Sequence, residues 1–580
     1  AVRTPFCVMG VLGILAVYLV TARFVSRRAG LLSAAVVATS PMYSLVARQA
    51  MTDMAFVGPM AMALALGAMA LFDDADDVLP RKGRGRFTTW PHHWLFYFAI
   101  GLFAVVTLPQ LIIDSVQLKI EMPWGNGILR MYGAVAMIPY YLGFAGFVVL
   151  AAQTRYKAPL YLYIAAVLCG LSVLAKGLAG LGLPLIVFIA YLGFTWNWRR
   201  LRRAQLIYGV IVSLVACAVV AVPWHHAMII RHGWAFWAEL FGDNHWRRMV
   251  LGRHGDRGTF EYFIHELGYA LWPWVALAPG ALVWAVTRRR PITSTPAETR
   301  AQGIFWLGAI WFVGAYALVS MSMTKFHHYV LPAVPGLAIC IGCFLDDLLR
   351  RSAPFSPRRL SRVATVLVIL GLPLLALVTA DLVNTKSASQ QFLWLFSYDY
   401  IHSPRGRPWP DALNFSGGLT TFAVLFGAAM IACLFDRLRR CAVVGFAVIG
   451  VVSTYFLLDY YMPRVAPFWS QKNVIAAYYR ARRSPEEKLI AFQMYWRGET
   501  FYTKNEIYEG PTSERTVFDQ EGADEKLREY MTRHRGRRLF FLIEKGQRGR
   551  LEGLIPPDAR SSFRVINDGN NKFILGQADL

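Results

Sequence analysis

The stretch VARQAMTDMAF, Val46 to Phe56, places one arginine and one aspartate between two long apolar runs. These runs, at about residues 31–46 and 55–72, approach the length of ~20 apolar residues that a helix needs to cross a bilayer. Only 17% of the 580 residues are charged, against about 25% in an average globular domain. The sequence therefore predicts an all-α polytopic membrane protein in which Asp53 lies at a turn between two spans.

Similar apolar runs recur up to about residue 458, after which the chain becomes mixed and charged. We assign residues 1–462 to a transmembrane domain and residues 463–580 to a soluble domain. The predicted spans are fourteen, at about 6–23, 31–46, 55–72, 93–107, 131–152, 158–173, 179–195, 206–223, 264–286, 303–320, 329–348, 363–383, 418–435 and 441–458.

The tail alternates between helical and extended patterns, which is typical of a small α/β domain. The predicted elements are helices at 471–483 and 524–534, strands at 488–496 and 537–545, and a hairpin at 563–576. This domain shows neither a phosphate-binding loop nor a paired-ligand spacing.

The net charge of +24 arises from 60 basic and 36 acidic residues. Basic clusters occupy short loops between spans, at 27–28, 81–86, 199–203, 288–290, 350–351 and 437–440. Cytoplasmic loops are enriched in Lys and Arg, and one orientation places every cluster inside. We therefore expect an inner-membrane protein whose Asp53 turn, Lys176 loop and C-terminal domain face outward. Because the charge is explained by topology, we do not expect nucleic acid as a partner.

All seven cysteines lie in or beside apolar segments, so the sequence predicts no disulfide framework. The pair Cys340 and Cys343 sits in an apolar helix and is expected to act as two small buried hydrophobes. Residue 1 is alanine and no signal peptide precedes the first span, from which we expect an incomplete N-terminus.

Two charged residues on the predicted outer side lie close to the membrane boundary. Asp53 stands where a helix begins, so it is suited to capping that helix and equally to serving as a base or as a ligand for a bound group. Lys176 has no acidic neighbour in sequence, and a lysine at mid-membrane costs roughly 2.5–3.5 kcal/mol. It must therefore either extend to the surface or meet an anion.

Residues 223–263 interleave aromatic and arginine side chains, which suits an amphipathic helix in the interface that either contacts phosphate groups or only anchors the chain. His254, Asp256 and Glu261 lie within this segment and have side chains of the types that bind a divalent metal, although their spacing is not diagnostic. No other cofactor is expected. Lys325 and Tyr329, at another outer turn, are suited to binding phosphate but are also ordinary interface residues.

Several motifs together resemble the bacterial membrane glycosyltransferases of families 39 and 83, which have the class C fold. The motifs are RRAGLLSAAVVATSPMYSLVARQAMTDM (27–54), LAKG (174–177), the Arg- and His-rich stretch 223–262, LWPW (271–274) and TKFHHYVLPAVPGLAI (324–339). The resemblance covers roughly residues 1–350, and the remainder matches only in architecture. Two departures are a longer loop at 109–130 and the pair His327-His328 where small residues or proline are commoner.

The resemblance implies transfer of a sugar, with inversion, from a polyprenyl-phosphate donor to an acceptor hydroxyl at the outer face of the membrane. The acceptor would be a lipid A-type glycolipid, a glycan or a protein. Carried over by motif, the residues expected to bind the lipid phosphate are Arg48, Lys176, Arg247, Lys325 and Tyr329. Asp53 matches the family's second external acidic position, whereas the family's principal acidic base would precede residue 1.

Two other classes of function remain open from the sequence. A transporter or flippase of lipid-linked sugars would need the same cations without a base, but the chain shows no convincing internal repeat. An assembly protein would use the tail to recruit partners.

Overall fold

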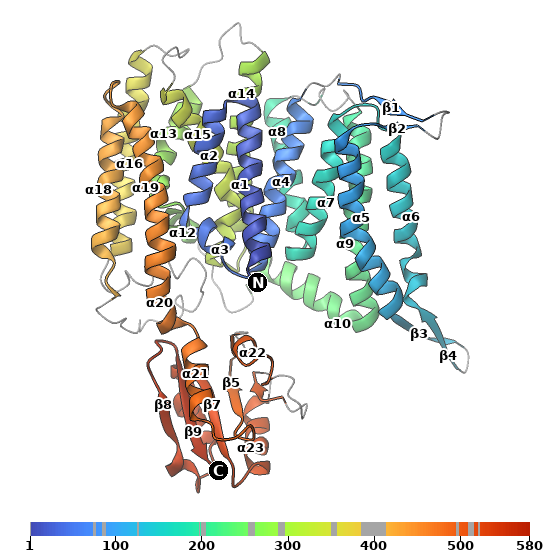
Figure 1. The fold of residues 1–580 in the computed structure, drawn as a ribbon, viewed down its shortest axis with the longest axis vertical. Helices are drawn as coiled ribbons and strands as arrows, with labels where there is room; N and C mark the ends of the chain where they lie inside the picture. Colours follow the sequence, from blue (N-terminus) through green and yellow to red (C-terminus); the bar gives the residue numbers. More distant parts are fainter. Residues whose placement is uncertain are drawn as a thin grey trace. The chain divides into compact units, whose positions relative to one another are not determined.

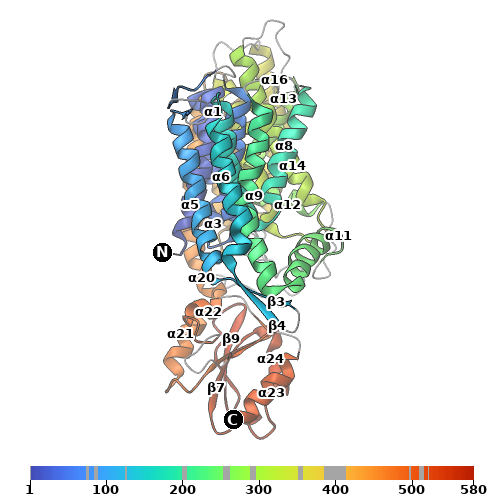
Figure 2. The same cartoon turned by 90° about the vertical axis from the view of Figure 1, so that its right-hand side faces the viewer.

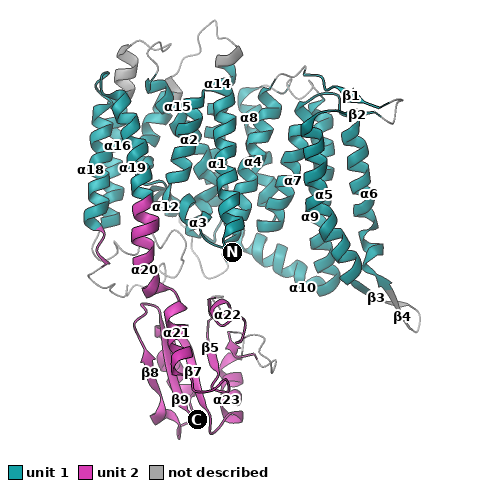
Figure 3. Cartoon of the chain, viewed as in Figure 1, with its two compact units in different colours: residues 1–404, 416–454 teal, residues 405–415, 455–580 magenta. Residues whose placement is uncertain are grey.

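The computed structural model describes residues 2–73, 77–83, 89–124, 127–196, 198, 205–252, 261–287, 296–349, 357–383, 413–494, 498–507, 515–519 and 522–580 (Figure 1). The chain forms two compact units, coloured separately in Figure 3. One contains residues 1–404 and 416–454, and the other contains residues 405–415 and 455–580. The longer segment of the second unit begins at Tyr455, eight residues before position 463, the boundary proposed from the sequence.

Ten helices in the described part of the first unit and its C-terminal extension are long and apolar enough to cross a membrane. They are α1 (Thr4–Phe24), α4 (Thr52–Phe72), α5 (Trp94–Gln117), α6 (Gly133–Ala152), α7 (Ala158–Lys176), α9 (Leu206–His232), α14 (Pro296–Ser320), η4 (His327–Ala333) with α15 (Val334–Leu349), α16 (Pro357–Val383), and α19 (Arg439–Tyr455) with η6 (Phe456–Tyr461) and α20 (Met462–Trp469).

The remaining predicted spans are bent or short. Helix α2 (Arg27–Thr39) meets α3 (Pro41–Ala47) at 68°, and α12 (Tyr262–Leu271) meets η3 (Trp274–Leu277) and α13 (Ala278–Thr287) at 106°. Both bends contain a proline, Pro41 or Pro273, and the residue before a proline is disfavoured in helical conformation. The short apolar helices are α8 (Ala179–Thr195) and α18 (Ser416–Ala432). Every predicted span therefore corresponds to a helix or a bent helix pair, and the helical membrane architecture is confirmed.

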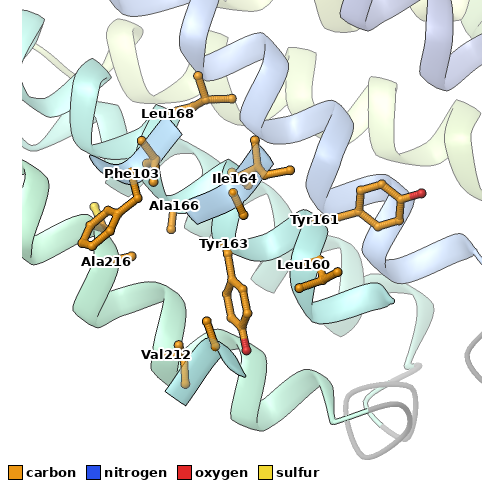
Figure 4. Close-up of a cluster of buried hydrophobic side chains, with 14 of the residues drawn as sticks. Phe103, Leu160, Tyr161, Tyr163, Ile164, Ala166, Leu168, Val212 and Ala216 are labelled. Carbon is orange, nitrogen blue, oxygen red and sulfur yellow. The ribbon is translucent and has the colours of Figure 1, made fainter. Parts of the chain in front are cut away.

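The helices α4, α7 and η4–α15 are the most deeply enclosed of the ten, and the others are half-buried at most. One cluster of buried side chains packs α7 against its neighbours α5, α6 and α9, and Figure 4 shows part of it. Within it the Phe103 and Phe147 rings lie 4.4 Å apart, and Phe147 meets Tyr163 edge-on at 5.5 Å. This packing fixes α7, the helix whose last residue is Lys176, against its neighbours.

The two ends of the bundle carry different chemistry. At the end that carries Arg27–Arg28 and Arg439–Arg440, three cation–carboxylate pairs join segments distant in the sequence: Arg23–Asp73 at 2.8 Å, Arg28–Asp346 at 2.5 Å and Lys157–Asp77 at 3.3 Å. A short hairpin, β1 (Arg81–Lys82) and β2 (Trp90–Pro91), lies at this end too (Figure 1). The turn between α3 and α4, which carries Asp53, lies at the opposite end.

Two irregular segments lie at the Asp53 end. The loop predicted at 109–130 is instead a continuation of α5 to Gln117, followed by an antiparallel hairpin of β3 (Lys119–Trp124) and β4 (Gly127–Tyr132). After Gly233, α10 (Trp234–Trp237), the π-helix η2 (Ala238–Arg247) and α11 (Arg248–Val250) form one further helical segment. It lies across the bundle helices in Figure 1, and its α11 end is seen in Figure 2. Trp234 and Trp246 are exposed there, as in the predicted interfacial helix.

The second unit contains a five-stranded sheet in the order β6-β5-β7-β9-β8. Strands β6 (Val517–Phe518), β5 (Leu489–Phe492) and β7 (Arg538–Glu544) are parallel, and β9 (Phe573–Asp579) is antiparallel to both β7 and β8 (Arg564–Asn567). The helices are α21 (Lys472–Ala481), α22 (Gly498–Tyr502), α23 (Ala523–Arg533) and α24 (Arg548–Leu554), with short turns η7 (Lys545–Gln547) and η8 (Arg560–Ser562). The predicted small α/β domain is confirmed, and β6, α22 and α24 were not predicted.

Lys572 is a buried lysine beside the last strand of this sheet. Its ammonium lies 5.2 Å from the centre of the Trp469 ring, 5.5 Å from that of Phe573 and 3.6 Å from the Glu544 carboxylate. Burial lowers the pKa of Lys572 to about 7. In the unfolded chain the pKa is that of an ordinary lysine, ~10.4, so the folded domain binds fewer protons between these two values.

We expect Lys572→Met to stabilise the C-terminal domain, by about 2 kcal/mol at pH 6 and by progressively less as the pH rises toward 10. Below pH 7 the folded wild type holds a buried charge that the variant lacks, whereas near pH 10 that charge is lost from the folded wild type. Pulse proteolysis in urea at pH 6 and pH 9, read from tail peptides, measures the difference. The exposed Lys472 provides the control, Lys472→Met. Destabilisation of Lys572→Met at pH 6 would contradict the prediction.

Candidate functional site

Asp53 lies in the first turn of α4 and is 5% exposed. Its carboxylate accepts a hydrogen bond from the Lys176 ammonium, the last residue of α7. The Nε2 atom of His328 lies 3.5 Å from the same Asp53 oxygen. The start of a helix also favours a negative charge. Lys176 therefore meets an anion, one of the two outcomes expected from the sequence.

The Lys176–Asp53 pair is not sealed off from its surroundings. The Lys176 side chain is 25% exposed, whereas that of Asp53 is 7% exposed. The ammonium also lies 4.8 Å from the centre of the Tyr329 ring, within the range of a cation–π contact. Lys176 thus holds the carboxylate on one side and presents charge on the other.

Arg248 is the second cation of the site. Its guanidinium donates to the Tyr329 hydroxyl at 3.4 Å and lies 5.8 Å from the centre of the Phe326 ring. The backbone carbonyl of Arg248 accepts from the Thr324 amide at 2.9 Å, which ties the end of the π-helix to the turn before His327. Arg248 Nε is buried without a hydrogen-bond partner, so the site holds an unused donor.

The residues selected from the sequence do not all lie in one site. The structure brings Asp53, Lys176 and Tyr329 together. Arg247 points elsewhere: its side chain is 54% exposed and pairs with Asp243 at 3.6 Å, and the neighbouring Arg248 enters the site. The sequence signal for Arg248 was its place in the Arg-rich segment, which did not distinguish it from Arg247.

Lys325 lies beside the site but is tied to the backbone. Its ammonium donates to the carbonyls of Ser320 at 2.7 Å and Ser322 at 2.9 Å, and it lies 5.2 Å from the centre of the Phe263 ring. Burial lowers the pKa of Lys325. Two of its three N–H donors hold the turn, so one remains for a ligand.

The other predicted positions lie at the edge of the site or outside the description. Arg48 follows the last residue of α3 and is exposed on the turn that leads to Asp53. Glu261 is exposed just before α12. His254 and Asp256 lie outside the described residues. Among the described residues, no group of three or more His, Cys, Asp or Glu side chains is placed to hold a metal ion.

His245, which sequence reasoning did not select, joins the π-helix to Leu178, two residues after Lys176. Its Nδ1 lies 2.5 Å from the Leu240 carbonyl, and its Nε2 accepts from the Leu178 amide at 3.4 Å. The ring occupies the space where a side chain at Gly177 would stand, because a Cβ there would lie 2.2 Å from Nε2. Gly177 has a φ of +73°, a conformation that favours glycine.

The charges of this site suit an anionic ligand. Lys176 and Arg248 contribute two positive charges and Asp53 one negative charge, which leaves +1 when the histidines are neutral. Tyr329 adds a hydroxyl and the face of its ring. The fold and this site together define a class: a multi-span helical membrane protein with a cationic, carboxylate-containing site at one end of its bundle.

The comparisons with known proteins narrow this class. The fold is similar to that of the crystal structure of ArnT from Cupriavidus metallidurans bound to undecaprenyl phosphate, with a TM-score of 0.59, 17% identity, and coverage of 100% of this chain and 84% of that one. The apo crystal structure of the same ArnT gives a TM-score of 0.55 over 83% of its chain. The class C glycosyltransferase-like fold expected from the motifs is thereby confirmed.

Curated relatives are similar over shorter stretches. The undecaprenyl phosphate-alpha-4-amino-4-deoxy-L-arabinose arabinosyl transferase of Serratia proteamaculans is 28% identical over 223 residues, which cover 38% of this chain and 36% of the relative. A second transferase of that name, from Proteus mirabilis, is 27% identical over 246 residues, or 42% of this chain and 40% of the relative. The chain thus spans less than half the length of these relatives, and no family model matches it.

Proposed function

We propose that this chain transfers a sugar from a polyprenyl-phosphate donor to the hydroxyl of a membrane-embedded lipid acceptor. The observation that carries the proposal is the Lys176–Asp53 pair, with Arg248 and Tyr329 beside it. The pair lies where α4 and η4 begin and α7 ends, and these are the three most deeply enclosed helices. The printed names of the relatives, which are undecaprenyl-phosphate sugar transferases, support the same class of donor.

The chemistry follows from the charges. In the reaction the anomeric C–O bond to the phosphate breaks and its electron pair moves to the phosphate oxygen. The acceptor O–H bond breaks, its proton passes to a base or to water, and the oxygen forms a new bond to the opposite face of the anomeric carbon. Negative charge therefore grows on the phosphate as it leaves, and fixed cations stabilise that charge. We assign this role to Lys176 and Arg248, with Tyr329 and the remaining donor of Lys325 as further phosphate contacts. Asp53 holds Lys176 in place through their ion pair.

The direct test is transfer by the purified full chain in nanodiscs. Radiolabelled undecaprenyl-phosphate aminoarabinose is the first donor to use, because the relatives' names specify that donor. Lipid A is the first acceptor to use, because the motifs imply an acceptor of that glycolipid type. We expect a labelled glycolipid to form in an amount equal to that of the undecaprenyl phosphate released. Movement of labelled donor across the bilayer without product would instead favour the flippase alternative and reject the proposal.

We also propose that the Asp53 end and the C-terminal domain face the outside of the inner membrane. The described basic residues Arg27–Arg28, Arg81–Lys82 and Arg437–Arg440 lie at the other end, where loops facing the cytoplasm are expected. Cys441, which is exposed beside Arg439 and Arg440, is a natural probe of the basic end. The exposed Ser561 offers a matching position in the tail.

A membrane-impermeant maleimide should label Ser561→Cys in spheroplasts, and it should reach Cys441 only after the membrane is opened. Mass spectrometry of the labelled peptides separates the two positions. Early labelling of Cys441 with protection of position 561 would reverse the proposed orientation.

A further inference from the structure

Asp114 is a carboxylate within a membrane-spanning helix, outside the Asp53 site. It lies in α5, three residues before the last residue of that helix, Gln117, at the Asp53 end of the bundle. Helix α5 packs against α6 and α9, which Figure 1 shows together at one side of the first unit. An ionisable side chain in a membrane span is energetically costly and commonly serves a function. Neither the Asp53 site nor the ion pairs at the basic end explain its presence.

The face of α5 that carries Asp114 is otherwise apolar. Leu111 and Leu118, three residues before it and four residues after it, lie on the same helix face and are buried. They pack with Met137 of α6 and Ala227 of α9 in one buried cluster. The half-buried carboxylate of Asp114 therefore lies at a seam where three helices meet, between two leucines that point into the seam.

One oxygen of this carboxylate, Asp114 Oδ2, is buried without a hydrogen-bond partner. The polar side chains around it are occupied by one another. The Ser115 hydroxyl lies 3.2 Å from that of Tyr141, and the Tyr140 hydroxyl lies 3.0 Å from His226 Nδ1. Because buried polar atoms are nearly always hydrogen-bonded, this exception points to a donor that comes from outside the chain.

A cation lies near the carboxylate without reaching it. Arg231, the residue before the last of α9, acts on Asp114 through its charge. In the described structure the two side chains form no ion pair within 4.0 Å, and the Arg231 side chain is exposed. Ile113 and Val116, beside Asp114 on α5, are exposed apolar side chains of the kind that face lipid chains. The two charges thus lie at a surface that lipid covers, too far apart to neutralise each other directly.

We propose that Asp114 and Arg231 bind the headgroup of a phospholipid with a primary amine, phosphatidylethanolamine, in the leaflet at the Asp53 end. The lipid ammonium donates to the Asp114 carboxylate, and the lipid phosphate accepts from the Arg231 guanidinium. Such charge-assisted hydrogen bonds are the strong ones, and this headgroup carries the two charges that the site lacks. A choline headgroup has no N–H donor and a glycerol headgroup has no positive charge, so neither satisfies the carboxylate. This lipid site is separate from the proposed sugar transfer and does not depend on it.

The test is lipid binding to the full chain, measured by native mass spectrometry with phosphatidylethanolamine, phosphatidylcholine and phosphatidylglycerol of matched acyl chains. We expect the wild type to bind phosphatidylethanolamine at least about 10-fold more tightly than either other lipid. Asp114→Asn should bring the three affinities to within about twofold, because the ammonium loses its charged acceptor and the glycerol lipid is no longer repelled. Arg231→Gln should weaken all three lipids by a similar factor, since each carries a phosphate, and should keep the preference.

Asp381, two residues before the end of α16 and at the same end of the bundle, gives the control variant Asp381→Asn. It should keep the wild-type preference. Unfolding temperatures in nanodiscs made with each lipid give a second readout: phosphatidylethanolamine should raise that of the wild type above its value in phosphatidylcholine, but not that of Asp114→Asn.

Equal binding of the three lipids by the wild type, the result expected if only a water meets Asp114 Oδ2, would overturn the inference. A preference that survives Asp114→Asn would also overturn it. Loss of the preference in Asp381→Asn as well would show that the effect does not arise at Asp114, and would reject the site. Loss in Asp114→Asn alone, with folding retained in the nanodiscs, supports it.

Discussion

Lys176→Met is expected to lower sugar transfer by about 100- to 1,000-fold in kcat, since removing one preorganised charge-stabilising donor typically costs 10²–10³. Its Nζ donates to Asp53 and lies 4.8 Å from the centre of the Tyr329 ring. The loss should appear in the chemical step and in the affinity for undecaprenyl phosphate alike. Transfer assays and a binding measurement with undecaprenyl phosphate, each in nanodiscs, provide the two readouts.

The same substitution should also destabilise the protein, by about 2–4 kcal/mol, because it leaves the nearly buried Asp53 carboxylate without its cation. Because unfolding also abolishes activity, the double variant Asp53→Asn/Lys176→Met is needed to separate the two effects. With both charges removed, the free energy of unfolding should return to within about 1 kcal/mol of wild type, while activity stays lost.

The opposite end of the bundle supplies a matched control. Lys157 pairs with Asp77 at 3.3 Å, so Lys157→Met breaks a lysine–aspartate pair far from Tyr329 and His328. This variant should keep wild-type transfer. An active double variant, or a Lys176→Met variant that transfers sugar normally, would remove Lys176 and Asp53 from the proposed site.

Gly177→Ala is expected to reduce transfer about 100-fold and to lower the unfolding temperature. The new Cβ would lie 2.2 Å from His245 Nε2, so the imidazole must leave its place against the Leu178 amide. The backbone at Gly177, with φ +73° and ψ −155°, is itself almost restricted to glycine, at a cost of about 1–3 kcal/mol for another residue. Because Gly177 follows Lys176, both effects displace the ammonium.

Gly233 provides a control that separates the effect of the steric collision with His245 from the effect of backbone strain. Its φ of +64° and ψ of −151° nearly reproduce those of Gly177, but a Cβ at Gly233 would meet no atom within 4 Å. Gly233→Ala should therefore show only the cost of the backbone conformation. The double variant Gly177→Ala/His245→Ala should recover the part of the stability lost to the collision. Equal effects of the two glycine substitutions on activity and unfolding temperature would show that His245 does not matter.

Much of the fold was predictable because it depends on local pattern. Apolar length identified every span, including the two that bend at Pro41 and Pro273, since a hydropathy pattern reports burial in lipid whether or not the helix is straight. Period and turn residues identified six elements of the C-terminal domain, α21, α23, β5, β7, β8 and β9. Strand β6, with two residues, is too short to leave a pattern, and α22 and α24 carry no long amphipathic repeat.

The site was predictable only to the level of its segments. Sequence reasoning selected Asp53, Lys176 and Tyr329, but it selected Arg247, whereas the neighbouring Arg248 is the arginine that enters the site. The π-helix at Ala238–Arg247 explains this difficulty. Its wider turn changes the direction in which every following side chain points, so the ~100° rotation per residue of an α-helix does not predict whether Arg247 or Arg248 faces the site.

The sequence by itself determined that this chain is a helical multi-span membrane protein with a small α/β domain, because hydrophobic length and periodicity are properties of neighbouring residues. Only the tertiary structure decided that Lys176 meets Asp53 across 123 positions, that Lys325 is occupied by backbone carbonyls, and that His327 and His328 face opposite partners. These are contacts between distant segments, and the packing of α4, α7, α12 and η4 sets them.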